Sequence, residues 1–575
     1  MKNRDIETIC HLSPQQKGML FGTARGNEDG IFIEQYTCVL RGPLDVQAYR
    51  QAWQRVVDRH SILRTAFVWK EQEEPLQVVM REAEVPLKRQ DLRGVAPADQ
   101  RMLVEAYLNA DRRQAFKLMK APLMRLALLQ LGDEEHFFVW TIHHILVDGW
   151  CRPILLNEVS AAYAALLGGS EPRLEPSRPY KDYIAWLRRQ DVAQAESFWR
   201  GTLKGVTSPT PLGRPAGEGQ PAPAEEGFAD EEVRLPAQAV ASLQALARRH
   251  RLTLNTLVQC AWALVLARYG GTEDVVFGTT VSGRPADLPG SENMIGLFIN
   301  TLPFRAEVSP RLPFISWAAR VQEQHAEMRG YEYCSEGQIH GWSEMPASAP
   351  LYESVLVFQN YPFDRSGAGP ADSPLQIEQV RSSGARTEHA LTLLVTAASE
   401  VVLHAVYNRA RLSAQGASRA LGHLASLLTG IEAAPDRPVS ALLESIPDDE
   451  VPTFFPARTG EQLQQAAAYV APRTPTEEVL ARIWADTLGV EQLSVEANFF
   501  DLGGHSLLAT HLIAVVRETF RVELPLGSLF EAPTVAEMAT VIVQKTAEQV
   551  NDDVMMQALA EIEAASESRT GSGRI

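Results

Sequence analysis

The sequence lacks the cysteine and histidine patterns of a metal or disulfide protein. Its five cysteines are scattered over 575 residues without a CxxC pair, which excludes a zinc knuckle or a disulfide framework and suits a reducing compartment. The HExxH motif of zinc peptidases and the GxxxxGK[ST] phosphate loop are also missing. We therefore expect no metal site and no nucleotide-binding P-loop.

Long apolar runs and long basic runs are missing as well. The longest apolar run, at residues 257–267, is too short for a membrane span. The first residues, MKNRDIE, hold no apolar signal-peptide core. The net charge is −17 without a Lys/Arg run, which disfavours anionic partners. We expect a cytoplasmic monomer that binds neither nucleic acid nor membrane.

Pro, Gly and Glu gather in two stretches, near residues 205–232 and 448–471, and such composition marks linkers. Helical and strand-like patterns alternate on both sides of the first stretch, which predicts an α/β protein with two lobes. The strand-like runs are 136–142, 274–281, 354–360 and 400–408, and the helical runs are 48–59, 152–167, 237–249 and 255–269. We place the first domain at 1–447, with an N-lobe to about 203, a linker at about 204–232 and a C-lobe at about 233–447.

The last part of the chain has a different texture. Apolar residues recur at helical spacing in 476–488, 507–520 and 534–545, which predicts a small all-α bundle of up to four helices. Thr476 is the expected N-cap of the first helix. We place this domain at 471–546, after a linker at 448–470 and before a flexible tail at 547–575.

A first candidate site follows the strand at 136–142, where the chain reads HHILVDGW. Loops between a strand and a helix carry the chemistry of many α/β proteins. A neutral imidazole of His143 or His144 can accept a proton near neutral pH. Asp148 can orient a histidine or form an ion pair, and Gly149 allows an unusual backbone angle. Two adjacent histidines alone are usually ordinary loop residues.

A second candidate site is Ser506 in the segment LGGHSL, at the expected start of a helix. A helix N-terminus offers free N–H groups and a positive dipole end, which suit a phosphodiester on the serine. A plain serine N-cap gives the same pattern. The final glycine of the GxSxG nucleophile elbow is absent, so nothing indicates a hydrolase.

The whole series of motifs resembles the condensation domains of nonribosomal peptide synthetases, relatives of chloramphenicol acetyltransferase. HHxxxDG resembles their active-site signature, and the resemblance covers about residues 5–443. The other segments that match in order are LSPQQKGMLF (12–21), RHSILRTAF (59–67), YKDYIAW (180–186), VSGRP (281–285) and IGLFINTLPFR (295–305).

The resemblance implies a two-lobed fold and a role for each residue of the signature. His144 would face the reaction centre, and His143 would be structural. Asp148 would pair with an arginine, for which Arg284 is the first candidate and Arg64 the second. Cys151 stands where serine is usual. The reaction implied is aminolysis of a carrier-bound acyl thioester, with His144 as a general base or as a group that holds the amine.

Residues 471–546 resemble a peptidyl carrier domain, in which Ser506 would carry 4′-phosphopantetheine as the acceptor tether. A phosphopantetheinyl transferase would attach it, and an upstream carrier would bring the donor. Leu507, Leu508 and the segment at 529–530 would form either a docking face or core.

An adenylation domain usually stands between the two domains, and here only a short linker does. Either a separate adenylation domain loads Ser506 in trans, or one has been removed. An epimerisation domain would follow its carrier, and a cyclising domain would carry aspartates in the signature. From a different class, the chain would be a silent scaffold that tethers an intermediate; intact His144, Asp148 and Gly149 disfavour that.

Overall fold

The computed structural model describes residues 5–24, 32–69, 74–216, 227–346, 349–359, 375–382, 389–397, 400–455, 469–490, 492–500, 502, 504, 506–525 and 527–547. The chain divides into two compact units. The first consists of Met1–Val68, Leu76–Met345 and Pro350–Ala457, and the second is mainly Arg458–Ile575. The predicted tail from residue 548 onward lies outside the described residues.

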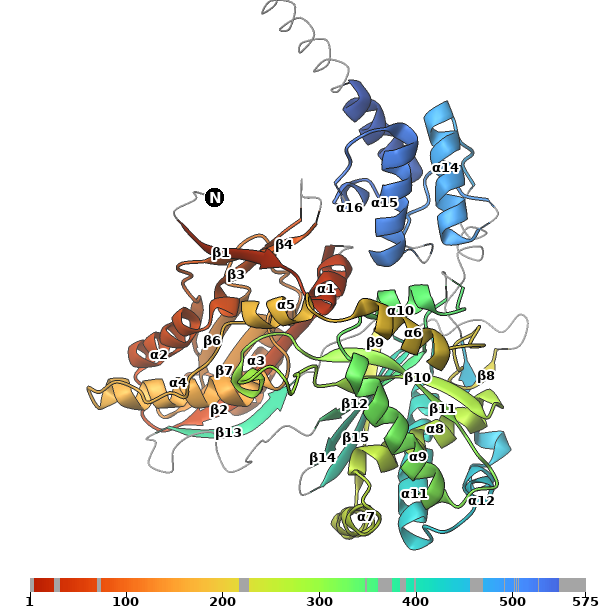
Figure 1. The fold of residues 1–575 in the computed structure, drawn as a ribbon. Helices are drawn as coiled ribbons and strands as arrows, with labels where there is room; N and C mark the ends of the chain where they lie inside the picture. Colours follow the sequence, from red (N-terminus) through yellow and green to blue (C-terminus); the bar gives the residue numbers. More distant parts are fainter. Residues whose placement is uncertain are drawn as a thin grey trace, which may run out of the picture. The chain divides into compact units, whose positions relative to one another are not determined.

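A five-stranded sheet with the order β13-β2-β7-β6-β5 forms the centre of the N-terminal lobe (Figure 1). Aromatic side chains fill the space between one face and two helices: the Trp53 ring lies 5.2 Å from that of Trp140, and Tyr49 packs edge-on against Phe138 at 5.5 Å. The opposite face packs on α3 through Val139 and its neighbours. The elements are β2 Ile33–Arg41, β5 Leu87–Asp91, β6 Met124–Gln130, β7 Glu135–His143, α2 Val46–Arg59, α3 Pro97–Arg112 and α4 Cys151–Leu167.

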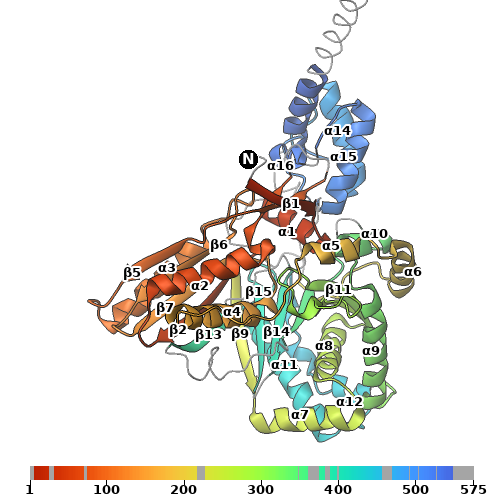
Figure 2. The ribbon, with the colours of Figure 1, turned by 60° about the vertical axis from the view of Figure 1, so that its left-hand side comes forward.

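A six-stranded sheet with the order β11-β10-β12-β14-β15-β9 forms the C-terminal lobe (Figure 2). Helix α8 is apolar on every side and almost wholly buried, as expected for a helix inside a core. The strands are β9 Phe228–Leu235, β10 Asp274–Val281, β11 Asn300–Glu307, β12 Ser354–Gln359, β14 Leu391–Ala397 and β15 Val401–Asn408. The helices are α7 Ala237–His250, α8 Leu254–Gly270, α9 Phe314–Met328, α10 Glu336–Trp342, α11 Ala414–Ala433 and α12 Val439–Leu443.

Smaller elements complete the N-terminal lobe. A three-stranded sheet has the order β1-β4-β3. These elements are β1 Ile6–His11, β3 Thr65–Val68, β4 Leu76–Met80, α1 Pro14–Ala24, α5 Lys181–Leu187 and α6 Val192–Thr202. The predicted strands and helices of both lobes are therefore present, and the expected two-lobed α/β fold is confirmed.

Two pairings between distant segments depart from the predicted boundaries. Strand β13 (Gln376–Ser382) belongs to the C-lobe by sequence, yet it pairs antiparallel with β2 of the N-lobe sheet. Strand β16 (Thr453–Phe454) pairs with β8 (Arg214–Pro215), so both predicted linkers contain ordered structure of the first unit. Proline and glycine content marked the segments that hold β8 and β16 as linkers, but backbone pairing with a distant strand leaves no local signal.

The second unit is a helical bundle, as predicted. Its helices are α14 Pro475–Leu488, α15 Ser506–Phe520, α16 Ser528–Glu531 and residues 535–547. Trp484 packs edge-on against Phe499 at 5.2 Å in its core. The N-cap is Thr474 rather than Thr476: its hydroxyl accepts the N–H of Glu477 at 3.2 Å. Within the described part of the chain, no helix combines the length and the apolar character that crossing a membrane requires.

Candidate active site

His143 is the last residue of β7, and both of its ring nitrogens are bound inside the protein. Its side chain is buried, and Nδ1 accepts the N–H of Ile145 at 3.1 Å. The ring proton is therefore on Nε2, which lies 3.0 Å from the hydroxyl oxygen of Thr23 and donates to it. Burial, with a smaller contribution from the neighbouring His144, lowers the pKa of His143 to about 3. The imidazole stays neutral and its two nitrogens are already bound.

His144 keeps one ring nitrogen available. Nδ1 lies 2.6 Å from the carbonyl oxygen of Val147 and donates its proton there, which leaves Nε2 with a lone pair in the neutral ring. The side chain is 12% exposed. Burial by itself lowers the pKa of His144, but the charge of Glu34, the Val147 carbonyl and the charge of Asp148 together raise it above its ordinary value.

Glu34 is the residue of this region that the sequence motifs did not reveal. It lies on β2, is 6% exposed, and places Oε1 3.5 Å from Nε2 of His144. The hydroxyl of Tyr36 donates to its Oε2. Its sequence neighbours, Ile33 and Gln35, gave no signal that it belongs to a site.

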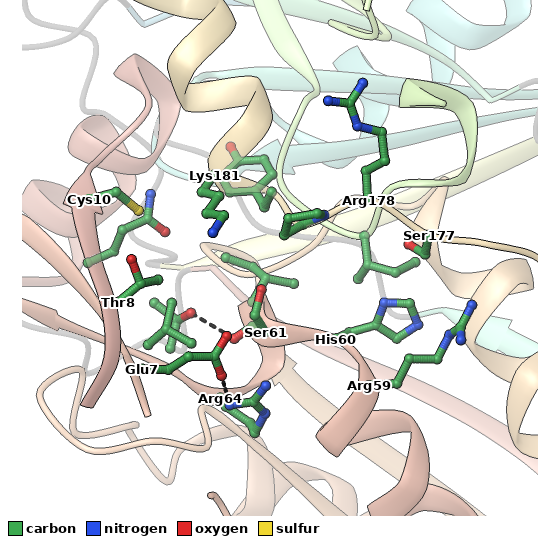
Figure 3. Close-up of a pocket in the computed structure, with 17 residues that line it drawn as sticks. Glu7, Thr8, Cys10, Arg59, His60, Ser61, Arg64, Ser177, Arg178 and Lys181 are labelled. Carbon is green, nitrogen blue, oxygen red and sulfur yellow. Dashed lines mark hydrogen bonds and ion pairs between the residues drawn. The ribbon is translucent and has the colours of Figure 1, made fainter. Parts of the chain in front are cut away.

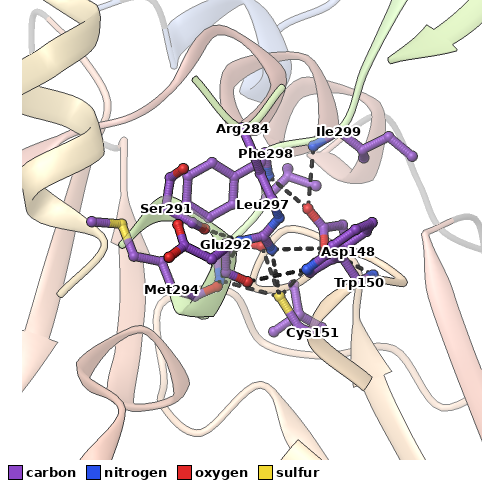
Figure 4. Close-up of polar contacts among 12 residues, drawn as sticks. Asp148, Trp150, Cys151, Arg284, Ser291, Glu292, Met294, Leu297, Phe298 and Ile299 are labelled. Carbon is purple, nitrogen blue, oxygen red and sulfur yellow. Dashed lines mark hydrogen bonds and ion pairs between the residues drawn. The ribbon is translucent and has the colours of Figure 1, made fainter. Parts of the chain in front are cut away.

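Asp148 is the centre of a buried network that joins the two lobes (Figure 4). Oδ2 accepts the backbone N–H groups of Phe298 at 3.0 Å and Ile299 at 3.3 Å. Oδ1 accepts from the N–H of Trp150 at 3.1 Å and from Nη2 of Arg284 at 3.3 Å. The side chains of Asp148 and Arg284 are 3% and 6% exposed. Both oxygens of the carboxylate are therefore engaged in holding the loop against the C-terminal lobe.

Arg284 is bound on several sides. Nη1 donates to the carbonyl of Met294 at 2.9 Å and to that of Ser291, and the guanidinium lies 4.2 Å from the centre of the Phe298 ring. Its pKa lies above the ordinary value: burial acts against the charge, but Asp148 and Cys151 outweigh it. Arg284 therefore holds together the loop of the C-terminal lobe that contacts Asp148.

Cys151 and Gly149 complete this loop. Sγ of Cys151 lies 3.3 Å from Oδ1 of Asp148 and 3.2 Å from the carbonyl oxygen of Gly296, so the thiol makes the contacts a serine hydroxyl would make. Burial raises the pKa of Cys151 to about 12. Gly149 lies in the turn and is partly buried. The described glycines with a positive φ do not include it, so the expected special backbone angle is not found there.

Arg64, the second candidate for the partner of Asp148, lies in a different place (Figure 3). It lines a cavity of about 190 Å³ between β1 and residues 177–181. Its Nη1 forms an ion pair with Oε2 of Glu7 at 2.8 Å, and its Nε donates to the carbonyl of Val57 at 3.3 Å. With a further bond to the carbonyl of Met80, these contacts connect Arg64 to β1, β4 and α2.

Ser506 is the first residue of α15. Two residues before it, a Cβ on Gly504 would lie 2.3 Å from the ring of Phe499, so only glycine fits at that position. The start of a helix suits a covalent phosphodiester on a serine. Leu529 is fully buried, so it belongs to the core, whereas the side chain of Leu507 lies outside the described residues.

Metal chemistry finds no support in the described part of the chain. No group of three or more His, Cys, Asp or Glu side chains is placed there to hold a metal ion. The five cysteines are free thiols.

Comparison with known proteins gives consistent matches. The "Condensation domain" family model matches residues 6–450, and the "Phosphopantetheine attachment site" model matches residues 478–542. A component protein of the linear gramicidin synthase of Brevibacillus parabrevis is 43% identical over 436 residues, which are 76% of this chain and 6% of that protein. Chondramide synthase cmdD of Chondromyces crocatus is 35% identical over 485 residues, 84% of this chain and 12% of that protein. The chain thus spans a small part of these relatives' length.

A solved structure shows the same fold. The starter condensation domain of rhizomide synthetase superposes with a TM-score of 0.65 at 20% identity, covering 76% of this chain and 97% of that domain.

Proposed function

We infer the activity from the family, because the chain belongs to the condensation-domain family of nonribosomal peptide synthetases and contains a phosphopantetheine attachment domain. Condensation domains are amide-forming acyltransferases. We propose that this one joins an acyl or peptidyl thioester, delivered by another carrier, to the amine of an aminoacyl group tethered at Ser506. The observation that carries the assignment is the ring of His144: Nδ1 is held by Val147 at 2.6 Å, and Nε2 is left for the amine.

The reaction requires little from the protein beyond the alignment of its two tethered substrates. Forming an amide from a thioester is downhill, so this step needs no ATP, and positioning two tethered substrates provides most of the acceleration. His144 accepts the proton that the amine gives up, or holds the amine by hydrogen bonding to it. Asp148 and Arg284 keep the C-terminal segment around Phe298 against the loop that carries His144.

The covalent cofactor is 4′-phosphopantetheine, and we propose Ser506 as the residue that carries it. When bound, the group supplies the thiol on which an amino acid is held. Ser506 is the first residue of α15, where the free N–H groups of a helix start favour a phosphodiester.

Carrier and adenylation partners follow from the modular context of the family. We propose three partners: an upstream donor carrier, an adenylation domain that acts in trans, and a phosphopantetheinyl transferase. The silent-scaffold alternative would need no lone pair at Nε2 of His144.

The test loads Ser506 with glycine and presents an acetyl group on a separate carrier protein. Intact-mass measurement should find the new amide on Ser506 and an empty donor carrier. Ser506→Ala, which removes only an N-terminal helix hydroxyl at a cost of about 1 kcal/mol, should gain no phosphopantetheine. His144→Ala should lose roughly 10²–10⁴-fold in single-turnover rate, and His143→Ala much less. An amide on the separate carrier would reverse the assigned direction, and full activity of His144→Ala would overturn the proposal.

A further inference from the structure

A buried carboxylate faces the imidazole of His144 from the neighbouring strand. Oε1 of Glu34 lies 3.5 Å from Nε2 of His144. The backbone holds the two together, because the N–H of His144 donates to the carbonyl of Phe32 at 2.8 Å, just before β2. Glu34 therefore approaches the one ring nitrogen that the loop leaves available.

The two oxygens of this carboxylate have different surroundings. Oε2 accepts the hydroxyl of Tyr36. The Tyr36 ring is itself held, at 4.9 Å from the ring of Trp140 and 5.3 Å from the guanidinium carbon of Arg152. Oε1 is the oxygen directed at His144, and the packed Tyr36 keeps it in that direction.

Oε1 of Glu34 and Nε2 of neutral His144 lack a proton donor between them. In the neutral ring, Nε2 carries a lone pair because the proton is on Nδ1. In that state the lone pair and the carboxylate oxygen repel each other, and the buried carboxylate lacks a positive partner. A protonated ring would pair with Glu34 directly, in line with the raised pKa of His144, but it could not accept a proton from the amine. A group that brings several N–H donors and a positive charge satisfies both atoms. A protonated amine is such a group.

We propose that Glu34 and His144 together bind the acceptor amine as an ammonium, with Glu34 holding the positive charge while His144 takes the proton. The inference rests on the proposed function and assigns the carboxylate as a second substrate-contacting group of that site. It also specifies the substrate class, an aliphatic amine that is protonated at neutral pH.

Over the reaction the ammonium loses two protons, one to the departing sulfur and one to solvent. The ammonium gives one proton to Nε2 of His144, and the resulting imidazolium stays paired with Glu34. The free amine nitrogen attacks the thioester carbonyl carbon, the C–N bond forms, and the C–S bond breaks. The departing sulfur takes the proton of the imidazolium, His144 takes the second proton from nitrogen, and that proton finally leaves to solvent.

Other charges around His144 act on the same titration. Asp148 is negative but shares its charge with Arg284, and His143 stays neutral with a pKa lowered to about 3 by burial. Arg152 lies beyond the Tyr36 ring. Glu34 is therefore the negative group in direct contact with Nε2, and its removal is the sharpest test.

The first measurement needs no substrate. Protein labelled with ¹³C-histidine is titrated by NMR, with the His144 signal assigned from the spectrum of His144→Ala. In Glu34→Gln the His144 titration should move to lower pH, and Glu34→Asp should largely restore it. The control is Glu353→Gln, which removes a different carboxylate, 3% exposed and bound to Arg411 at 2.6 Å, and should leave the His144 titration unchanged. An unchanged titration in Glu34→Gln overturns the proposal.

The second measurement separates charge binding from mere support of the ring. Single-turnover rates are compared with Ser506 loaded with glycine or with 3-aminobenzoate, whose amine is neutral at pH 7. Glu34→Gln should lose about tenfold or more with glycine and much less with aminobenzoate, and its acidic limb should move to lower pH. Equal losses with both acceptors would make Glu34 a structural residue only.

The two proposals fail in different ways. If wild type loads Ser506 but forms no amide from either acceptor, the proposed function fails. If wild type forms amide and Glu34→Gln keeps the same rate and pH profile, only the role of Glu34 fails. Melting curves of Glu34→Gln and Glu34→Asp check that each variant is folded.

Discussion

Replacing Asp148 by alanine removes the acceptor that joins the His144 loop to the C-terminal lobe. The backbone N–H groups of Phe298 and Ile299 lose their partner, and the guanidinium of Arg284, which is 6% exposed, loses its counter-charge. The side chain that disappears touches none of the atoms proposed to react. We therefore expect the main effect on stability.

The magnitude follows from what is left behind. Leaving one member of a buried ion pair uncompensated costs about 3–5 kcal/mol. Each stranded buried N–H group costs about 1–3 kcal/mol on its own, but water entering the gap relieves part of this, so the costs do not add. We expect a loss of about 4 kcal/mol for Asp148→Ala. Asp148→Asn should lose less, because its amide oxygen can still accept from Phe298 and Ile299.

Differential scanning calorimetry measures the effect, with the transition of the first unit followed separately, because a chain of two units need not unfold in one step. At about 2 °C per kcal/mol for a lobe of this size, the transition should fall by roughly 8 °C. The control is Asp91→Ala, which removes an exposed aspartate paired with Arg93 at 2.7 Å, and should leave the transition where it is. A melting temperature equal to that of wild type, combined with loss of amide formation, would refute this reasoning and make Asp148 a direct participant.

Three further outcomes test the packing around the site. Cys151→Ser should keep stability and activity, since the hydroxyl can make the same contacts. In native wild type, Cys151 should resist iodoacetamide at pH 8, because burial raises the pKa of its thiol to about 12. Fast labelling of Cys151, detected by peptide mass spectrometry, would contradict this. Gly283→Ala should destabilise the protein far more than Gly271→Ala. Both glycines have φ of +62°, but only at Gly283 would a Cβ meet a backbone atom, the carbonyl oxygen of Phe298 at 1.7 Å. Equal melting temperatures of the two variants would refute this expectation. Burial raises the pKa of Glu332 from 4.5 to about 7, so the folded state binds this proton more tightly, and stability is lost as pH rises from about 4.5 through 7. Glu332→Gln should remove that loss, so the variant should melt higher than wild type at pH 8 but not at pH 4. Identical melting curves for the two proteins at both pH values would show the reasoning to be wrong.

Local patterns in the sequence predicted the elements of this protein well. Apolar spacing located the strands at 136–142 and 274–281 and the helices at 237–249 and 255–269, which the structure places within about two residues. The HHILVDGW loop and the serine at the start of a helix were visible for the same reason, since a loop between two elements is a local feature. The family followed from motifs of this kind in a fixed order.

Contacts between distant segments were decided only by the tertiary structure. Asp148 reaches Arg284 rather than Arg64 because the loop before β11 folds against the end of β7, while Arg64 is held by Glu7. The pairing of β13 with β2 crosses from one lobe to the other, and no local composition encodes it.

Glu34 shows the physical reason most clearly. By sequence it lies outside every predicted strand and motif, and its own neighbours contain nothing that distinguishes a solvated glutamate from a buried one. The antiparallel register of β2 with β7 sets Glu34 opposite Ile142, so Glu34 lies on the same face of the sheet as His144, two residues further along the chain. Sequence spacing determines which face of a strand a side chain occupies, but the register between strands determines what that side chain meets. That register made a carboxylate the neighbour of Nε2 of His144.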